Sequence, residues 1–464
     1  MDNLNSSPSP VLRDAFSSGK TKPYSFRLLQ LNAILQMLEE HEADFIEALN
    51  KDMHRPRFET VLSEMITVKN EAMYAINNLQ KWMKPKTISL LDNCFVQKEP
   101  VGVVLIVGGW TFPIEQSLIP MIGAVAAGNC VILKPSENSS QAANLLQILL
   151  PQYMDTVSKK GGMMIKTSIF LHICVSWFPG DRTIGKQVLQ VAAKKLTPVS
   201  LVLGGKNPCY VDKLCDLRVA ARRIAWARFI NAGQNTLAPE YVLCHPDLKE
   251  RLIHELRNCV REFYGHNPRE SPDYGRMACT EQYQRVKDLL STGQVAFGGE
   301  TDDGDLYIAP TVLTDVQEPD AIMEHEILGP ILPILTTQTL DEAIDFINKR
   351  DRPMTIYVYS GNQEVISQIM HRTSSGSFCS NDSMIQNLNT SLPCGGIGSS
   401  GIGIYRGKYS FNTFSHRRAC VLRTTTAECV THLRYPPYTE KTLQLIKWAC
   451  TLSKKENSSW CCIL

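Results

Sequence analysis

The sequence predicts an α/β protein with two doubly wound α/β lobes and a small β hairpin. Its 464 residues exceed the usual size of one hydrophobic core, so more than one lobe is expected. From Val101 onward, apolar runs such as GVVLIVGG and NCVILKPSE alternate with helical segments such as PIEQSLIPMIGAVAAG and SQAANLLQILL. Parallel strands joined by crossover helices give this alternation. It returns between residues 206 and 381, which predicts the second lobe.

The other elements follow in order along the chain. Residues 24–82 carry Leu, Ile, Ala and Met at helical spacing, which predicts two or three amphipathic helices. Residues 82–100 break that spacing and alternate, as an excursion or hairpin would. Helices are predicted again at ARRIAWARFINAG, LKERLIHELRNCVREF and LDEAIDFINKRD. The Gly-rich run after Ser391 predicts a loop that leads into an edge hairpin, and LQLIKWACTL predicts a last helix.

Composition is that of an ordinary globular protein, with 44% hydrophobic and 20% charged residues. The 48 basic and 46 acidic side chains nearly balance, so we expect no nucleic-acid partner. The start, MDNLNSSPSP, has neither the basic nor the apolar region of a secretory signal, which predicts a cytosolic chain. Its fifteen cysteines are then expected to be mostly reduced, and without C-x-x-C spacing they predict no metal site.

Six blocks, in chain order, carry a family resemblance: GVVLIVGGWTFP, GNCVILKPSE, LVLGGKNPCYVD, FINAGQNTLAPEY, EHEILGPILPI and LPCGGIGSSGIGIYRGKYSFNTFSH. From about Tyr24 to Arg423 the chain resembles the aldehyde dehydrogenases. The last block and the C-terminal Cys motif resemble the third family and its prenylated B-type members. The resemblance implies a Rossmann-like cofactor domain, a catalytic domain, and NAD(P)-dependent oxidation of medium- or long-chain, lipid-derived aldehydes to carboxylic acids.

The resemblance also implies a division of the chain. The expected parts are N-terminal helices and a dinucleotide-binding domain in 1–83 and 100–203, bridging or oligomerisation segments in 84–99 and 391–430, a catalytic domain in 204–390, and a tail in 431–464. The bridging segments lead us to expect a homodimer or a heterodimer with active relatives.

Three catalytic positions are implied, and each is substituted. The nucleophile of N-A-G-Q-x-C falls on Thr236, the base of L-E-L-G-G-K on Val202, and the oxyanion amide of W-N-Y-P on Thr111. A thiol is partly ionised at neutral pH, whereas an alcohol needs a nearby base, and Val202 cannot take a proton. Rescue by Cys209 or Cys244 is an alternative to the interpretation of these two as buried, unreactive thiols.

The cofactor positions are better preserved. The resemblance implies that Lys134 holds the adenosine ribose and that Glu326 holds the nicotinamide ribose; the alternative is that both are exposed loop charges. The other implied cofactor residues are Trp110, Glu137, Gly180 and Gly185.

The phosphate turn departs from the family, because Pro179 removes an N–H donor and Asp181 places a carboxylate where the diphosphate should lie. Asp is also a good helix cap, so Asp181 is expected to accept from the same backbone N–H groups that would otherwise bind the diphosphate. Weakened binding of NAD or NADP is therefore expected. Upstream, residues 155–178 differ from the family both in amino-acid sequence and in length. Either the local fold is rebuilt or the chain is a disturbed gene product.

The chain ends Cys461-Cys462-Ile463-Leu464, a prenylation signal that favours geranylgeranyl on Cys461. One lipid anchors only marginally, so a second signal is needed, such as nearby lysines or acylation of Cys450 or Cys462. If prenylated, the protein is expected at the cytoplasmic face of a membrane, either the plasma membrane or a lipid droplet. Without the lipid it is expected in the cytosol.

Three functions stay open at this point. The first is an aldehyde dehydrogenase, severely impaired by its substitutions. The second is a catalytically silent, membrane-anchored scaffold or dimer partner of active relatives. The third is a binding module for nucleotides or lipid aldehydes, which requires high ligand affinity.

Overall fold

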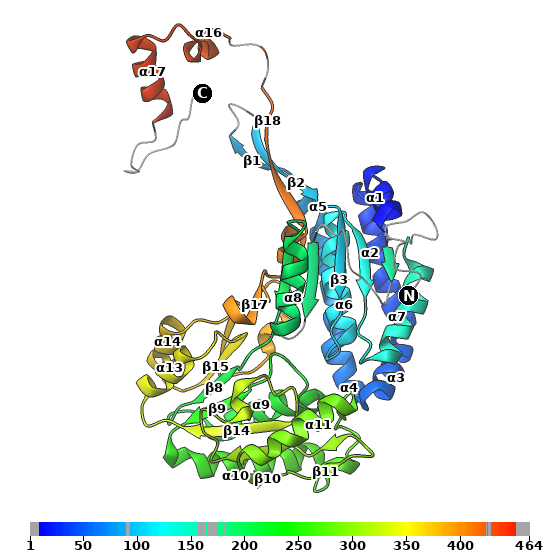
Figure 1. Ribbon diagram of the computed structural model, residues 1–464, viewed down its shortest axis with the longest axis vertical. Coiled ribbons are helices and arrows are strands. Elements are labelled where there is room, and N and C mark those ends of the chain that lie inside the picture. Colours follow the sequence, from blue (N-terminus) through cyan, green and yellow to red (C-terminus); the bar gives the residue numbers. More distant parts are fainter. Residues whose placement is uncertain are drawn as a thin grey trace.

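Two α/β lobes face each other, and a slender third sheet extends away from the first of them (Figure 1). This arrangement agrees with the predicted α/β class. The structure is a computed structural model, and it describes residues 9–89, 93–155, 163–165, 175–179, 182–423, 425 and 428–451.

The first lobe holds a six-stranded sheet in the order β17-β7-β6-β3-β4-β5, parallel except for β17. The chain starts at β3 in the middle, adds β4 and β5 on one side, and then crosses to β6 and β7 on the other. Ligands of doubly wound sheets bind at such a reversal, beyond the carboxyl ends of the strands. The strands are β3 (Val103–Val107), β4 (Cys130–Lys134), β5 (Met163–Ile165), β6 (Val175–Pro179), β7 (Val199–Val202) and β17 (Gly401–Ile402).

Helices cover this sheet, and α2 and α6 both pack against α5. As predicted, residues 24–82 fold into three helical stretches, the last of which continues from Arg57 to Met83 through a π-helical turn. Such turns are often found at functional sites. The helices are α1 (Ser9–Ser17), α2 (Tyr24–Glu40), α3 (Glu42–Met53), α4 (Arg57–Thr60), the π turn η1 (Val61–Met65), α5 (Ile66–Met83), α6 (Pro113–Ala127), α7 (Ser140–Tyr153) and α8 (Arg182–Ala193).

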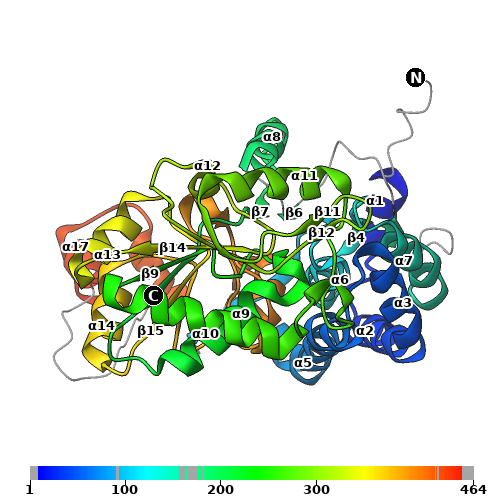
Figure 2. The ribbon, with the colours of Figure 1, turned by 90° about the horizontal axis from the view of Figure 1, so that it is seen from below.

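The second lobe holds a seven-stranded sheet in the order β10-β13-β14-β9-β8-β15-β16, parallel except for β10. Figure 2 shows α9 and α10 on one face of this sheet and α11 on the other, so both faces are buried. The strands are β8 (Pro208–Val211), β9 (Tyr241–Cys244), β10 (Gln294–Phe297), β13 (Thr311–Thr314), β14 (Ile331–Thr336), β15 (Thr355–Tyr359) and β16 (Ser377–Ser380), beside a small pair, β11 (Thr301–Asp302) and β12 (Tyr307–Ile308).

The helices of this lobe match the three predicted from sequence and add others. They are α9 (Leu217–Phe229), α10 (Pro246–Tyr264), α11 (Thr280–Leu289), α12 (Ala321–Glu324), α13 (Leu340–Lys349) and α14 (Gln363–Arg372), with 3₁₀ turns η3 (Ile230–Gly233), η4 (Pro268–Glu270), η5 (Leu290–Thr292), η6 (Ile385–Leu388) and η7 (Gly398–Ser400).

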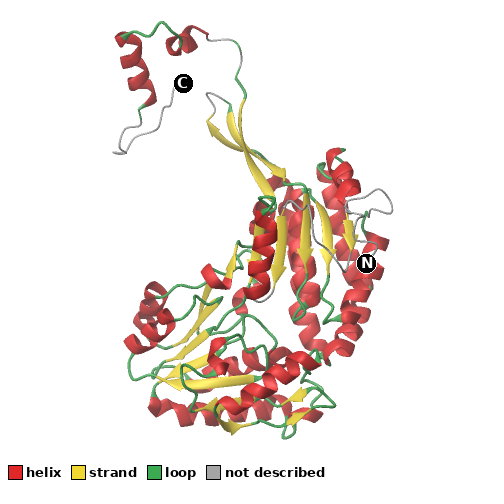
Figure 3. Ribbon diagram, in the orientation of Figure 1, coloured by secondary structure: helices red, strands yellow, loops and turns green. Residues whose placement is uncertain are grey.

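The third sheet is antiparallel and joins the two segments predicted to form hairpins (Figure 3). Its strands are β1 (Lys86–Ser89), β2 (Cys94–Pro100) and β18 (Ser415–Val421), with β2 in the middle. After β18 the chain forms α16 (Glu428–Thr431), η8 (His432–Arg434) and the predicted last helix, α17 (Glu440–Cys450), whereas α15 (Gly407–Thr413) precedes β18. Cys461 lies outside the described residues. Within the described part, no helix is both long and apolar enough to span a bilayer.

Candidate active site

A cavity of about 60 Å³ lies where the π turn, the start of α6, the end of β7 and the loop after α9 meet. Val202 and Thr236 both line it, so the structure brings two of the three predicted catalytic positions together. Leu62, Phe112 and Met354 supply much of its apolar wall. A mostly apolar cavity with a few polar groups is the usual form of a small-molecule site.

The loop that carries Thr236 is held in an unusual backbone conformation. Asn231, Ala232 and Gly233 have φ angles of 53°, 49° and 73°, which is the left-handed region that side chains disfavour. A Cβ at Gly233 would lie 2.3 Å from the Gly329 carbonyl oxygen, so only glycine fits there. Strained backbone of this kind persists where surrounding contacts fix it, and it gathers at functional sites.

Thr236 itself is half-buried at the cavity wall. Its carbonyl accepts a hydrogen bond of 2.8 Å from the Asn207 side chain, which fixes the backbone at this position. Among the described residues, no carboxylate or imidazole accepts a hydrogen bond from the Thr236 hydroxyl. An alcohol in this setting has no base to activate it.

Val202 ends β7 and is only 8% exposed. It pairs in register with Gly401 of β17, so its hydrocarbon side chain is positioned by the sheet. The predicted base position therefore contributes an apolar surface to the cavity. It can exclude water but cannot accept a proton.

Thr111 does not line the cavity, and it is 4% exposed. Its hydroxyl accepts a hydrogen bond of 2.9 Å from the amide nitrogen of Gln116, whose side chain does line the cavity. The Thr111 carbonyl accepts from Arg55 and, at 3.0 Å, from Asn231. In this structure, Thr111 joins the loop after β3 to the loop that carries Thr236.

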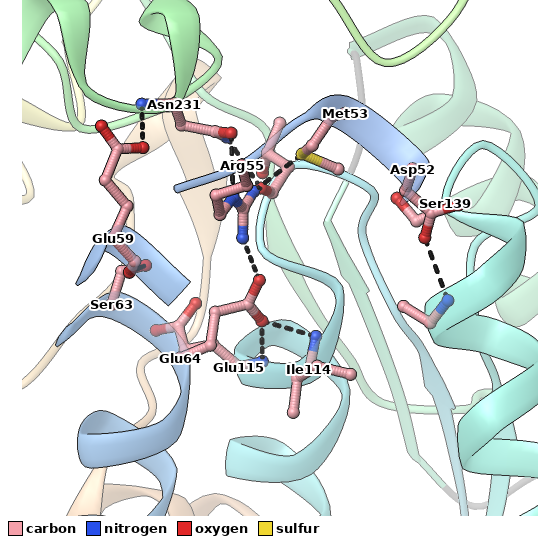
Figure 4. A network of polar contacts seen from close by, with 12 residues as sticks. Asp52, Met53, Arg55, Glu59, Ser63, Glu64, Ile114, Glu115, Ser139 and Asn231 are labelled. Atoms are coloured by element: carbon pink, nitrogen blue, oxygen red, sulfur yellow. Dashed lines mark hydrogen bonds and ion pairs between the residues drawn. The ribbon is translucent and has the colours of Figure 1, made fainter. Parts of the chain in front are cut away.

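A buried polar network supports these loops (Figure 4). The Arg55 side chain, 0% exposed, donates to Asn231 at 3.0 Å and to Glu64. Glu64 accepts from the backbone N–H groups of Ile114 and Glu115 at 2.7 and 2.9 Å, and so caps the first turn of α6. The network thus connects the π turn to both loops of the site.

Burial raises the pKa of Glu59, which accepts from the backbone N–H of Asn231, and that of Glu71, each to about 7. Their ordinary pKa is 4.5, so between these values the folded state binds more protons than the unfolded state. The stability that each group contributes is therefore complete below its unfolded pKa and is lost as pH rises through 7.

We expect Glu59→Gln to flatten this fall in stability by up to about 3 kcal/mol between about pH 5 and pH 7.5, because the amide does not titrate. Urea unfolding at the two pH values measures it. Glu39→Gln, at an exposed position, is the matched control and should keep the wild-type slope. An unchanged slope in Glu59→Gln would contradict the assignment.

The predicted cofactor residues surround the reversal point of the first sheet only in part. Lys134 ends β4 and pairs with Glu137 at 3.3 Å, and the Trp110 carbonyl accepts from Ser139 at 2.9 Å. Gly185 of α8 packs so closely on Leu203 that a Cβ would lie 2.6 Å from it. Gly180, like Asp181, lies outside the described residues.

Glu326 is half-buried, with one carboxylate oxygen that has no hydrogen-bond partner. Burial, reinforced by the nearby Glu240 carboxylate, raises the pKa of Glu326 to about 8. Its other oxygen would lie 2.1 Å from a Cβ at Gly204, whose φ is +67°, so glycine is required there. A free acceptor at this position suits a ligand hydroxyl, as a ribose offers.

Cys394 is a further cavity residue, and it was not singled out from the sequence. It lies in LPCGGIG, the start of the last of the six blocks that carry the family resemblance. The sequence feature that could have identified Cys394 is a thiol within a Gly-rich loop, and this loop returns to the sheet of the first lobe. Cys209 and Cys244, in contrast, are buried in strands β8 and β9, where burial raises the pKa of both thiols.

Residues 12–420 match the aldehyde dehydrogenase family. The chain belongs to this family. It is 46% identical over 455 residues to aldehyde dehydrogenase family 3 member B2 of Mus musculus, with 95% of each chain covered. It is also 46% identical over 444 residues to family 3 member B1 of Homo sapiens, covering 94% of this chain and 95% of that one. These similarities confirm the predicted third-family, B-like assignment.

The aldehyde dehydrogenase fold is confirmed by a solved structure as well. The substrate-bound state of Staphylococcus aureus AldH superposes with a TM-score of 0.90 at 36% identity, covering 94% of this chain and 97% of that chain. Within this aldehyde dehydrogenase, the implied nucleophile and base positions thus share one cavity, while the implied oxyanion position lies behind its wall.

Proposed function

We propose that this chain is an aldehyde dehydrogenase in which oxidation of medium- and long-chain, lipid-derived aldehydes is severely impaired or lost. One observation carries the proposal: the cavity presents an alcohol at Thr236 and a hydrocarbon at Val202. Loss of a general base alone lowers rates by about 10² to 10⁴. Loss of an oxyanion donor lowers them by about 10² to 10³, although such factors do not multiply when residues act as a unit.

The test is the activity of the full-length wild type. We expect NAD(P)H formation from an aliphatic aldehyde series to stay near background, and intact-mass spectra to show no acyl adduct on Thr236. Turnover typical of the family, or an acyl group trapped on the unmodified protein, would overturn the proposal. A curated B-type relative assayed in parallel shows that substrate and cofactor are competent.

The cofactor that fits the described residues is NAD or NADP, which when bound supplies the hydride acceptor. Lys134, at the carboxyl end of β4, would hold the adenosine ribose, and Glu326, with its free oxygen, the nicotinamide ribose. Lys134 lies at the carboxyl edge of the first sheet, where the reversal of strand order places a ligand crevice, and Glu326 of the second lobe lies beside Gly204, which follows β7 of that sheet.

We propose that Asp181 weakens this binding by occupying donors that would otherwise meet the diphosphate. Asp181→Ser should then raise NAD(P) affinity by about tenfold, the size of one lost charge repulsion near a helix start. Calorimetric titration of both proteins measures it. Lys186→Ser, a change on the following helix, serves as control, and equal affinities in wild type and Asp181→Ser would count against the role.

We propose further that geranylgeranyl on Cys461 anchors the chain to the cytoplasmic face of the plasma membrane or of lipid droplets. The terminal motif, Cys461-Cys462-Ile463-Leu464, supports this. Most wild type should sediment with membranes, whereas Cys461→Ser should become mainly soluble. Equal partition of the two proteins would exclude prenylation as the anchor.

A second candidate function is a silent scaffold or dimer partner of active relatives. The outer edge of β18 favours it, because among the described strands β18 pairs only with β2, and a free edge can pair with another chain. Light scattering and co-purification with a tagged active relative would test it. This candidate function would be excluded if the protein is monomeric at all concentrations and does not co-purify with the tagged relative.

A further inference from the structure

A second polar group, built from Cys394, Arg406 and Glu115, lies at the edge of the cavity, which Cys394 and Glu115 line. Cys394 lines both the cavity and a smaller one that adjoins it, and Arg406 lines the smaller one. Cys394 is held by two backbone hydrogen bonds with Tyr405, of 3.1 and 2.8 Å. The thiol therefore has a fixed place beside the predicted catalytic positions.

Arg406 is 1% exposed, and its Nη2 atom donates a hydrogen bond to the Glu115 carboxylate. Its Nε and Nη1 atoms are buried and have no nitrogen or oxygen partner among the described residues, and the guanidinium lies within hydrogen-bonding reach of the Cys394 thiol. A buried guanidinium with free donors is uncommon, because almost all buried polar atoms are paired. Its backbone φ of 82° is also one that side chains rarely adopt, and the Ser410 hydroxyl stabilises it by accepting from the Arg406 N–H at 2.7 Å.

These groups suit a ligand with an apolar chain and an electrophilic head that carries an acceptor oxygen. Leu237 and Met354 line both cavities and offer an apolar surface to the chain. The free donors of Arg406 offer two hydrogen bonds to an oxygen that gains negative charge. The Cys394 thiol, a soft nucleophile, supplies the bond-forming atom.

We propose that Cys394 captures α,β-unsaturated aldehydes covalently, with Arg406 binding their carbonyl oxygen. The sulfur bonds to the β carbon, the carbon–carbon π bond breaks, and the thiol proton ends on the α carbon. The product is a thioether that keeps the aldehyde. No oxidant, reductant or cofactor takes part.

This capture is distinct from the proposed dehydrogenase function. It needs neither Thr236 nor Val202, and it proceeds without NAD(P). Assays without nucleotide therefore test it alone, so either proposal can fail while the other holds. Burial raises the pKa of the Cys394 thiol, so less thiolate is present and the addition to the aldehyde is slow. The neighbouring Arg406 cation acts in the opposite direction and lowers this pKa.

The experiment compares two reagents on the reduced, full-length protein. Trans-2-nonenal, followed by borohydride, and iodoacetamide are each mapped by peptide mass spectrometry at Cys394 and at exposed Cys450. The Cys394 to Cys450 labelling ratio should be at least about tenfold higher for nonenal, because the part of its alkyl chain nearest the aldehyde packs on Leu237 and Met354. Equal ratios, or no nonenal on Cys394, would overturn the proposal.

Two variants complete the test. Cys394→Ser should abolish the selective adduct, and Cys450→Ser should leave it unchanged. Arg406→Lys should slow nonenal addition at Cys394 by about tenfold or more while slowing iodoacetamide far less, because alkylation builds no charge on oxygen. Equal slowing of both reagents would reduce Arg406 to a structural role and contradict its part in the capture. If that variant does not fold, the reagent ratio and Cys394→Ser decide the proposal.

Discussion

Thr236→Cys is expected to produce a burst of NAD(P)H approaching one equivalent per chain, followed by slow turnover. The variant places a thiol on a loop whose left-handed backbone and Asn231 contacts are intact, so the nucleophile meets the aldehyde in the cavity. Hydride loss from the adduct leaves a thioester on Cys. The thioester accumulates, because Val202 cannot activate the water that would release it.

Adding Val202→Glu to this variant should raise steady-state turnover by about 10² to 10⁴, since a base then serves hydrolysis. The new carboxyl group enters a position that is 8% exposed, so burial is expected to raise its pKa and to shift activity to higher pH. Val202→Gln is the matched control, because it has the same shape but cannot take a proton. Stopped-flow absorbance separates burst from turnover, and a Gln variant as fast as the Glu variant would refute the role of the base.

Thr111→Asn alone should add little. The Thr111 hydroxyl now accepts from Gln116 and lies behind the cavity wall, so an amide placed there must first displace that contact.

The fold could be predicted from the sequence because its strands are buried on both faces of the sheets. Such strands appear as continuous apolar runs between helices. The runs predicted near residues 102–109 and 130–135 are β3 and β4, and the helices predicted in the second lobe are α9, α10 and α13. The hairpin after Trp82 was also predicted. Its pairing with β18 was not, because the alternation of one strand does not identify a partner some three hundred residues away.

The site was predicted less evenly, for a physical reason. Motif spacing located Thr236 and Val202, which the fold brings to one cavity. It did not predict that Arg55 bonds Asn231, or that Arg406 pairs with Glu115, because a charged residue far along the chain resembles any solvated charge until the fold buries it. Cys394 was passed over because its Gly-rich surroundings do not show that this loop returns to the cavity.

Arg55→Met is expected to destabilise the protein by about 3 to 5 kcal/mol, the typical cost of removing one partner of a buried ion pair. Methionine keeps the aliphatic contact with Phe112, over whose ring the Arg55 guanidinium lies at 4.9 Å. It leaves the Glu64 carboxylate in the interior without its cation and the Asn231 side-chain oxygen without its donor, whereas the Thr111 carbonyl keeps the donor from Asn231. Chemical denaturation at neutral pH measures the loss.

The pH dependence distinguishes an unpaired charge from lost packing. Burial already raises the pKa of Glu64, and without Arg55 that pKa rises further. The folded state of Arg55→Met then binds a proton more tightly than the unfolded state, so part of the lost stability should return as pH falls towards 5. Glu64→Gln in the same chain still accepts from Ile114 and Glu115 and carries no charge, so the double variant should be more stable than Arg55→Met at neutral pH. It should also lack the part of the recovery that Glu64 contributes, and keep the part that Glu59 and Glu71 contribute. If Arg55→Met is destabilised relative to wild type by the same amount at both pH values, the packing of the guanidinium, and not the charge on Glu64, holds the two loops together.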